Sequence, residues 1–138
     1  MKKFAFFLIL FGVCLLWQDC TKKESSDSTS EFTNKIELGT GIDPSNYFNL
    51  TGIGTTFSST ANIYFRLESK DDMGGSAVKI QVMRSNGILY NAWDYPNPQS
   101  YGHILISAFK IAEAGNFTVT GILVNGSKTI ASIAVVIN

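Results

Sequence analysis

Residues 77–90 read AVKIQVMRSNGILY, and this stretch decides the fold class. Apolar and polar side chains alternate with a period of two from Ala77 to Met83, which is typical of a β-strand with one buried face. Asn86 and Gly87 then interrupt the alternation, and apolar residues resume after them. Because Asn-Gly tolerates positive φ angles at both central positions of a tight turn, the stretch predicts a β-hairpin.

The alternation continues on both sides of this hairpin. Residues 62–68 form an earlier alternating segment, and residues 103–111 alternate better than they follow a helical stripe. Residues 116–124 and 128–137 form a last pair around a second Asn-Gly dipeptide. Turn signals at a spacing of roughly 8–12 residues are typical of β-sandwiches and barrels, so we expect an all-β domain.

Length and charge narrow the classes of function. The chain has 138 residues, with 11 basic and 11 acidic side chains, and is long enough for one domain. Lys2, Lys3 and Asp19 are the charged side chains before Cys20, so the remainder carries nine basic against ten acidic residues. This balance provides no electrostatic attraction for nucleic acid, and we expect no nucleic-acid partner.

The N-terminus has the pattern of an export signal. Lys2 and Lys3 precede an unbroken apolar run that extends from Phe4 to Trp17. This run is shorter than the roughly 20 residues that a membrane-spanning helix needs, but it fits a signal peptide. We therefore predict a signal peptide at residues 1–19, with an uncleaved membrane anchor as the alternative.

Cys20 follows this region directly, and the segment resembles the N-terminus of bacterial lipoproteins, in which such a cysteine is acylated. Trp17 and Asp19 depart from the leucine and the small residue that usually precede that cysteine. Cys14 is the other candidate, but it lies inside the apolar run with no polar stretch after it. The resemblance implies fatty acylation at Cys20, a flexible tether over residues 20–34 and membrane attachment through the lipid.

The implied location is the cell envelope. Thr21 gives no inner-membrane retention signal, which favours the outer membrane, on either its periplasmic face or the cell surface. Cys14 and Cys20 are the two cysteines of the sequence, and both precede the domain at residues 35–138. The domain therefore has no internal disulfide and no thiolate metal ligand.

Residues 114–119 read AGNFTV. This phrase resembles the opening of the penultimate strand in bacterial immunoglobulin-like modules, and the similar region covers residues 62–137. The resemblance implies an antiparallel immunoglobulin-like β-sandwich of about seven strands over residues 35–138, with Phe117 in the core or at a corner beside the turn. Modules of this family serve mostly as stalks, spacers or recognition domains.

The sequence offers little for catalysis. His103 is the single histidine, and no nucleophile-elbow sequence accompanies it, so we predict no catalytic residue, no enzyme activity and no cofactor. Glu68, Asp71 and Asp72 precede two glycines, a pattern that fits either a weak calcium site or a solvated turn. We favour the turn, because the spacing matches no calcium loop and Lys70 dilutes the negative charge.

Four aromatic residues are the best candidates for binding a partner: Tyr90, Trp93, Tyr95 and Tyr101. Two prolines predict an ordered loop from Tyr95 to Tyr101. Aromatic side chains with polar neighbours suit stacking on a sugar or anchoring a protein, and the alternative is that they fill or cap the core. In an extended segment, Tyr90 lies on the face opposite to Trp93 and Tyr95.

Together these features predict a non-catalytic envelope lipoprotein. Its sandwich is expected to act as a binding or structural module for a protein or glycan partner. Two alternatives stay open: an accessory subunit of an envelope complex, and a calcium-stabilised spacer module.

Overall fold

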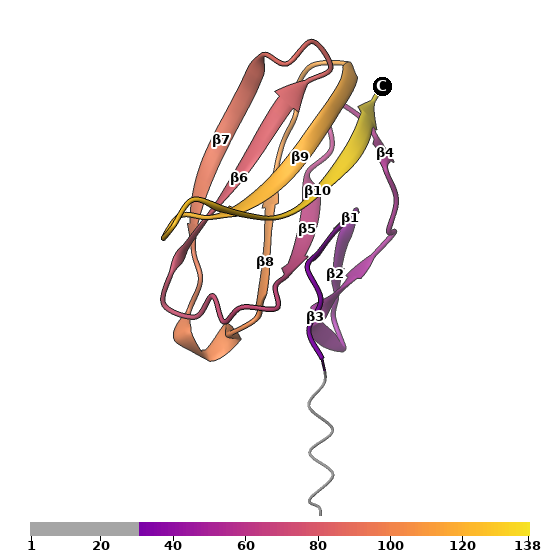
Figure 1. The fold of residues 1–138 in the computed structure, drawn as a ribbon. Coiled ribbons are helices and arrows are strands. Elements are labelled where there is room, and N and C mark those ends of the chain that lie inside the picture. Colours follow the sequence, from indigo (N-terminus) through magenta and orange to yellow (C-terminus); the bar gives the residue numbers. More distant parts are fainter. Residues whose placement is uncertain (1–30) are drawn as a thin grey trace, which may run out of the picture.

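The computed structural model describes residues 31–138, so the predicted signal peptide and Cys20 lie outside the described residues (Figure 1). The elements are β1 Lys35–Gly39, β2 Gly41–Asp43, β3 Asn46–Thr51, β4 Thr56–Phe57, β5 Ile63–Glu68, β6 Ala77–Arg84, β7 Leu89–Pro96, the 3-10 turn η1 Gln99–Tyr101, β8 Ile104–Phe109, β9 Gly115–Leu123 and β10 Lys128–Ile137. Within residues 31–138, no helix is long and apolar enough to cross a membrane. The predicted all-β class is confirmed.

Two sheets pack face to face. One has the strand order β1-β5-β8 and the other β4-β10-β9-β6-β7, and every pair is antiparallel except β10 with β4. With β1, β5 and β8 as strands A, B and E, and β10, β9, β6 and β7 as G, F, C and C′, this is the strand order of an immunoglobulin-like sandwich. The predicted architecture is therefore confirmed.

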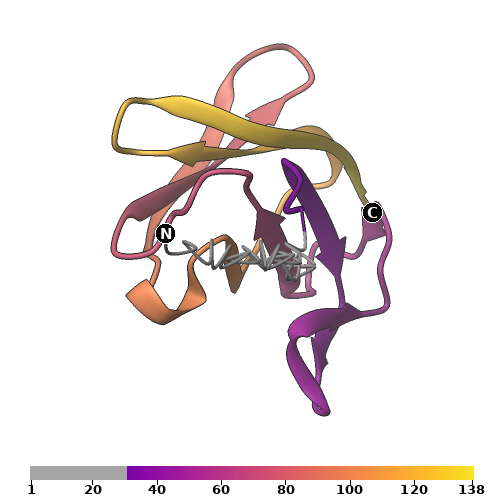
Figure 2. The same cartoon turned by 60° about the horizontal axis from the view of Figure 1, so that its bottom comes forward.

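The structure adds one feature that the sequence did not indicate. Within the described part of the chain, strands β2 and β3 pair only with each other, and they form a short hairpin between β1 and β4. Figure 2 shows this hairpin projecting away from the two main sheets. The described chain therefore has ten strands, more than the expected seven or so.

The core lies between β5 and β6. The apolar positions predicted on both strands are fully buried: Ile63, Phe65 and Leu67 on β5, and Val78, Ile80 and Val82 on β6. Gly121 of β9 allows a close approach between the sheets, because a Cβ atom there would lie 2.6 Å from Cδ1 of Leu67. The two-residue period of the sequence thus defines the faces that meet inside the sandwich.

The β6–β7 hairpin turns where the sequence predicts, but with a different geometry. Gly87 has a φ of 81°, whereas Asn86 keeps a negative φ. The Gly87 N–H donates to the carbonyl of Arg84 at 2.9 Å, and the Arg84 N–H donates to the carbonyl of Ile88 at 2.8 Å. Asn-Gly tolerates positive φ at both positions, but Gly87 alone adopts it here, because a turn followed by one left-handed residue closes this longer loop.

The AGNFTV phrase opens β9, as the resemblance implies. Phe117 is buried, and its ring meets that of Tyr90 edge to face, with centroids 5.4 Å apart. The side chain therefore belongs to the core beside the turn, where a phenylalanine needs no hydrogen-bond partner.

Phe65 provides a direct test of this core. The side chain is fully buried and its ring packs against those of Tyr95 and Phe109. We expect Phe65→Ala to lower the free energy of unfolding by about 3–5 kcal/mol, since it removes buried surface and leaves a cavity. Urea denaturation measures this loss. Tyr64→Ala, on the outward face of the same strand, is the control, and equal losses for the two variants would contradict the packing described.

Candidate functional site

The three aromatic residues of β7 all face the core. Tyr90, Trp93 and Tyr95 are half-buried and pack against the buried cluster. The prediction that Tyr90 faces away from Trp93 and Tyr95 is wrong, because the β6–β7 register shifts between Val82 and Met83 and leaves Tyr90 as an extra residue. A bulge of this kind changes the face of the strand from which a side chain projects, and here it places Tyr90 over the core.

These side chains also join the two sheets. Strand β7 is the edge of the five-stranded sheet, and β8 is an edge of the three-stranded sheet. The Tyr95 hydroxyl donates to the carbonyl of Ala108 on β8 at 2.8 Å, and burial raises the pKa of Tyr95, which keeps this donor protonated. The Trp93 ring stacks on Phe109, with centroids 5.6 Å apart. The β7 aromatics therefore close the side of the sandwich.

Tyr90 completes this closure at the other end of β7. Its hydroxyl accepts a hydrogen bond from the N–H of Ala112 at 3.0 Å, and the Arg84 guanidinium lies over its ring, 5.0 Å from the centroid. Arg84 also pairs with Glu113 at 2.8 Å, and this pair raises the pKa of Arg84 and lowers that of Glu113. The sequence left two roles open for Tyr90, Trp93 and Tyr95, which were binding a partner and filling or capping the core. In the structure, all three side chains pack against the core.

Tyr101 lies in different surroundings from the other three candidates. The loop that carries it starts at Asn97, because β7 extends through Tyr95 to Pro96 and the predicted loop start at Tyr95 is wrong. Buried Asn97 donates through Nδ2 to the carbonyl of Gly102 at 3.0 Å and closes the loop around η1. This bond holds Tyr101 at one end of the sandwich.

Tyr101 forms an aromatic group with two residues of β3 that the sequence reading missed. The ring centroid of Tyr101 is 6.1 Å from that of Tyr47 and 5.3 Å from that of Phe48. Tyr47 is 50% exposed, and partial burial together with the neighbouring Tyr101 raises its pKa. We call Tyr47, Phe48 and Tyr101 the entry aromatics, because the elements that carry them, β3 and η1, lie at the end where the chain enters the domain (Figure 1).

The entering chain is attached to this end before the first strand begins. Thr33 donates to Oε1 of Glu68 from its N–H at 2.7 Å and from its hydroxyl at 3.0 Å. The N–H of Lys70 donates to Oδ1 of Asn34 at 2.9 Å, and the ring of Phe32 stacks on His103 with centroids 4.3 Å apart. Contacts with the domain therefore start within the segment that the sequence assigned to the tether.

His103 is held as a structural residue at this end. Its Nδ1 lies 3.0 Å from the carbonyl of Ser69, which only accepts hydrogen bonds, so Nδ1 carries the proton and donates. Asp94, the acid that a catalytic triad would need, points outward on β7 with its carboxylate 4.0 Å from Nζ of Lys79. The geometry does not assemble these residues into catalytic machinery.

The three carboxylates considered for calcium have separate partners. Glu68 pairs with Nη2 of Arg66 at 2.7 Å, Asp71 pairs with Lys128, and Asp72 accepts the N–H of Gly74 at 2.7 Å. Partial burial raises the pKa of Glu68, but the hydrogen bonds from Thr33 and Arg66 outweigh it, so the pKa lies below its ordinary value. Residues 31–138 contain no group of three acidic, histidine or cysteine side chains placed to hold a metal ion.

The strand order defines the class of the domain, an immunoglobulin-like β-sandwich. No protein-family profile and no curated protein matches the chain. Among solved structures, it is similar to an immunoglobulin-like protein from Pseudomonas aeruginosa, with 12% identity over 78% of this chain and 95% of that chain and a TM-score of 0.49. The assignment of the fold rests on the strand order and not on this similarity.

The closure by β7 predicts a specific effect of one hydroxyl group. We expect Tyr95→Phe to lower the free energy of unfolding by about 1 kcal/mol, because the carbonyl of Ala108 loses its cross-sheet donor while the ring stays in place. Urea denaturation measures the change, with Tyr64→Phe as the control. If Tyr95→Phe were no more destabilising than Tyr64→Phe, this hydrogen bond would not join the sheets.

Proposed function

We propose that this chain is a lipid-anchored, non-catalytic module of the cell envelope that presents an immunoglobulin-like domain to a protein or glycan partner. Cys20 follows the apolar run at positions 4–17 and precedes a polar stretch, which supports anchoring through a lipid. The outer membrane is the proposed location.

One observation carries the binding role. The chain enters at one end of the sandwich, and the β6–β7 turn lies at the opposite end (Figure 1). An anchor at Cys20 would therefore hold the domain by the end opposite to that turn. The far end of such sandwiches carries loops that vary freely without changing the strands, which suits recognition.

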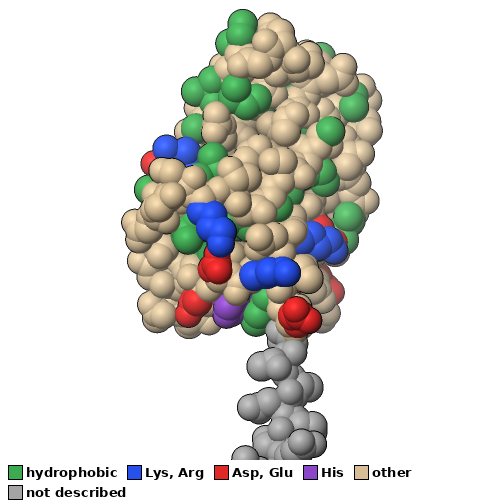
Figure 3. All heavy atoms as spheres, in the orientation of Figure 1, with side chains coloured by type: hydrophobic (Ala, Val, Ile, Leu, Met, Phe, Trp, Pro, Cys, Tyr) green, Lys and Arg blue, Asp and Glu red, His purple; other side chains and the backbone are tan. Residues whose placement is uncertain are grey.

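The β6–β7 turn exposes apolar side chains in this position. Ile88 is 58% exposed and Leu89 is 49% exposed. On the face drawn in Figure 3, the charged side chains gather in the half of the molecule nearer the chain entry. Adjacent exposed aliphatic side chains favour a protein over a glycan as the partner, because sugar rings stack on aromatic side chains.

An accessory subunit of an envelope complex is the second candidate function. Strand β7 has eight residues and, within residues 31–138, pairs with β6 alone, so its other edge offers unpaired backbone groups to a strand of another chain. In this alternative, the partner pairs along β7 beside Ile88 and Leu89, and the same end of the domain is used.

The anchor is tested by two matched cysteine variants of the full chain. We expect Cys20→Ala to move the protein from the membrane fraction to the soluble fraction, whereas Cys14→Ala leaves it in the membrane. Mass spectrometry of the purified wild type should find an acyl group on Cys20. Retention of Cys20→Ala in the membrane would contradict the proposed anchor and favour an uncleaved apolar segment.

The binding surface is tested by photo-crosslinking in intact cells. A photoreactive residue at position 88 should give one discrete adduct, and Leu89→Asp should abolish that adduct, because a charge disrupts an apolar contact. A photoreactive residue at Ser132, exposed on β10, is the matched control. Equal adducts at both positions, or none at position 88, would refute the proposed surface.

A further inference from the structure

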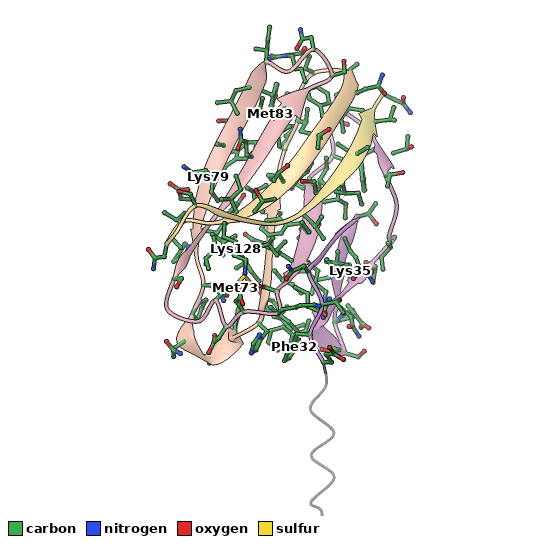
Figure 4. All side chains as sticks on the ribbon, in the orientation of Figure 1. Phe32, Lys35, Met73, Lys79, Met83 and Lys128 are labelled. Atoms are coloured by element: carbon green, nitrogen blue, oxygen red, sulfur yellow. The ribbon has the colours of Figure 1, made fainter. Side chains whose placement is uncertain are left out.

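The entry aromatics contact one another across two elements of the domain. Tyr47 and Phe48 come from β3 and Tyr101 from η1. Figure 1 shows β3 and the turn η1 at the end of the domain where β1 begins, and Figure 4 places Phe32 at the same end. Two elements that are far apart in the sequence thus bring aromatic side chains to the end of the domain nearest to its tether.

We propose that the entry aromatics dock on the lipid surface that holds the acyl anchor, with their rings at the level of the headgroups. The domain then stands with its entry end on the membrane instead of moving freely on a tether. This inference rests on the proposed anchor at Cys20 and goes beyond it, because acylation alone does not orient the domain.

The length of the tether supports the lipid surface as the partner of the entry aromatics. Phe32 stands twelve residues after Cys20. Twelve residues span about 40 Å at most, whatever their conformation. The entry aromatics are therefore held near the lipid surface at an effective concentration of the order of millimolar, where a weak contact becomes well populated.

The chemistry of the entry aromatics also suits a lipid interface. Tyrosine has an apolar ring and a polar hydroxyl, and this combination favours the boundary between headgroups and acyl chains. Tyr47 is half exposed, and Phe48 beside it is partly buried and supplies further apolar surface. A single exposed ring would give little affinity by itself, but the acyl anchor already supplies the attachment.

The charged side chains of β1 and β5 at this end form ion pairs with one another. Lys35 pairs with Glu37 at 2.7 Å, and Arg66 lies 3.6 Å from Glu37 and 2.7 Å from Glu68. Asp43, at the β2–β3 turn, accepts bonds from the N–H and hydroxyl of Ser45. Among residues 31–138, Lys70 is the basic side chain at this end that forms no ion pair, and one lysine is not a basic patch. The docking therefore depends on the aromatic rings, and neither anionic lipid nor low salt is required.

The test uses the mature, acylated chain in phosphatidylcholine vesicles that contain a headgroup-linked nitroxide quencher. Acylation blocks Cys20, so Ser100→Cys beside Tyr101 or Ser85→Cys in the β6–β7 turn provides the one free thiol for a fluorophore. Both serines are exposed. We expect the label at position 100 to be quenched several-fold more strongly than the label at position 85, with no change between low and high salt.

The deciding comparison is the double variant Tyr47→Ser and Tyr101→Ser. We expect it to lose most of the quenching at position 100 while it sediments with the vesicles and unfolds cooperatively as before. Undiminished quenching would show that the tether alone causes proximity, and would overturn the docking. Equal quenching of the two labels in the wild type would also overturn the docking. That result would favour a protein or glycan as the partner of the entry aromatics.

Failure of the anchor gives a different result from failure of the docking. A chain that lacks the acyl mass and does not sediment with vesicles refutes the proposed anchor, and the inference fails with it. A chain that carries the acyl group and sediments, but shows no effect of the double variant, refutes only the docking.

Discussion

The packing of β5 against β6 is the interaction on which the rest of the structure depends. Each strand contributes three fully buried apolar side chains, and the two strands belong to opposite sheets. The described domain lies after the cysteines of the sequence, so burial and strand pairing stabilise it without a disulfide. The other strands of the two sheets flank this pair on either side, whereas β2 and β3 form a separate hairpin.

Closure of the sandwich needs a second set of contacts. The consecutive strands β7 and β8 lie in different sheets, so no backbone ladder joins them. Aromatic side chains bridge the gap instead, through ring contacts with Phe65 and Phe109 and through the Tyr95 hydroxyl. These rings pack against the core in this role, and each stays partly exposed at the side of the sandwich.

The sequence predicted the features that depend on local pattern. Two-residue periodicity defined the buried faces of β5 and β6, the Asn-Gly dipeptide located the β6–β7 turn, and AGNFTV located the start of β9. It could not predict the bulge at Tyr90, because a one-residue shift in register depends on how the turn closes and leaves no mark on the alternation. The grouping of Tyr101 with Tyr47 and Phe48 was also hidden, since residues so far apart in the sequence meet only through the tertiary fold.

The direction of β1 has a mechanical consequence. The chain enters at Lys35, and β1 pairs with β5 over its whole length to Gly39. A pull on the N-terminal chain acts along the axis of β1, so the hydrogen bonds of this ladder are loaded in shear and share the force, instead of breaking one after another. The bonds of Thr33 and Asn34 to the end of β5 and the loop after it take up the load first. The domain is thus built to bear tension at the end by which it would be held.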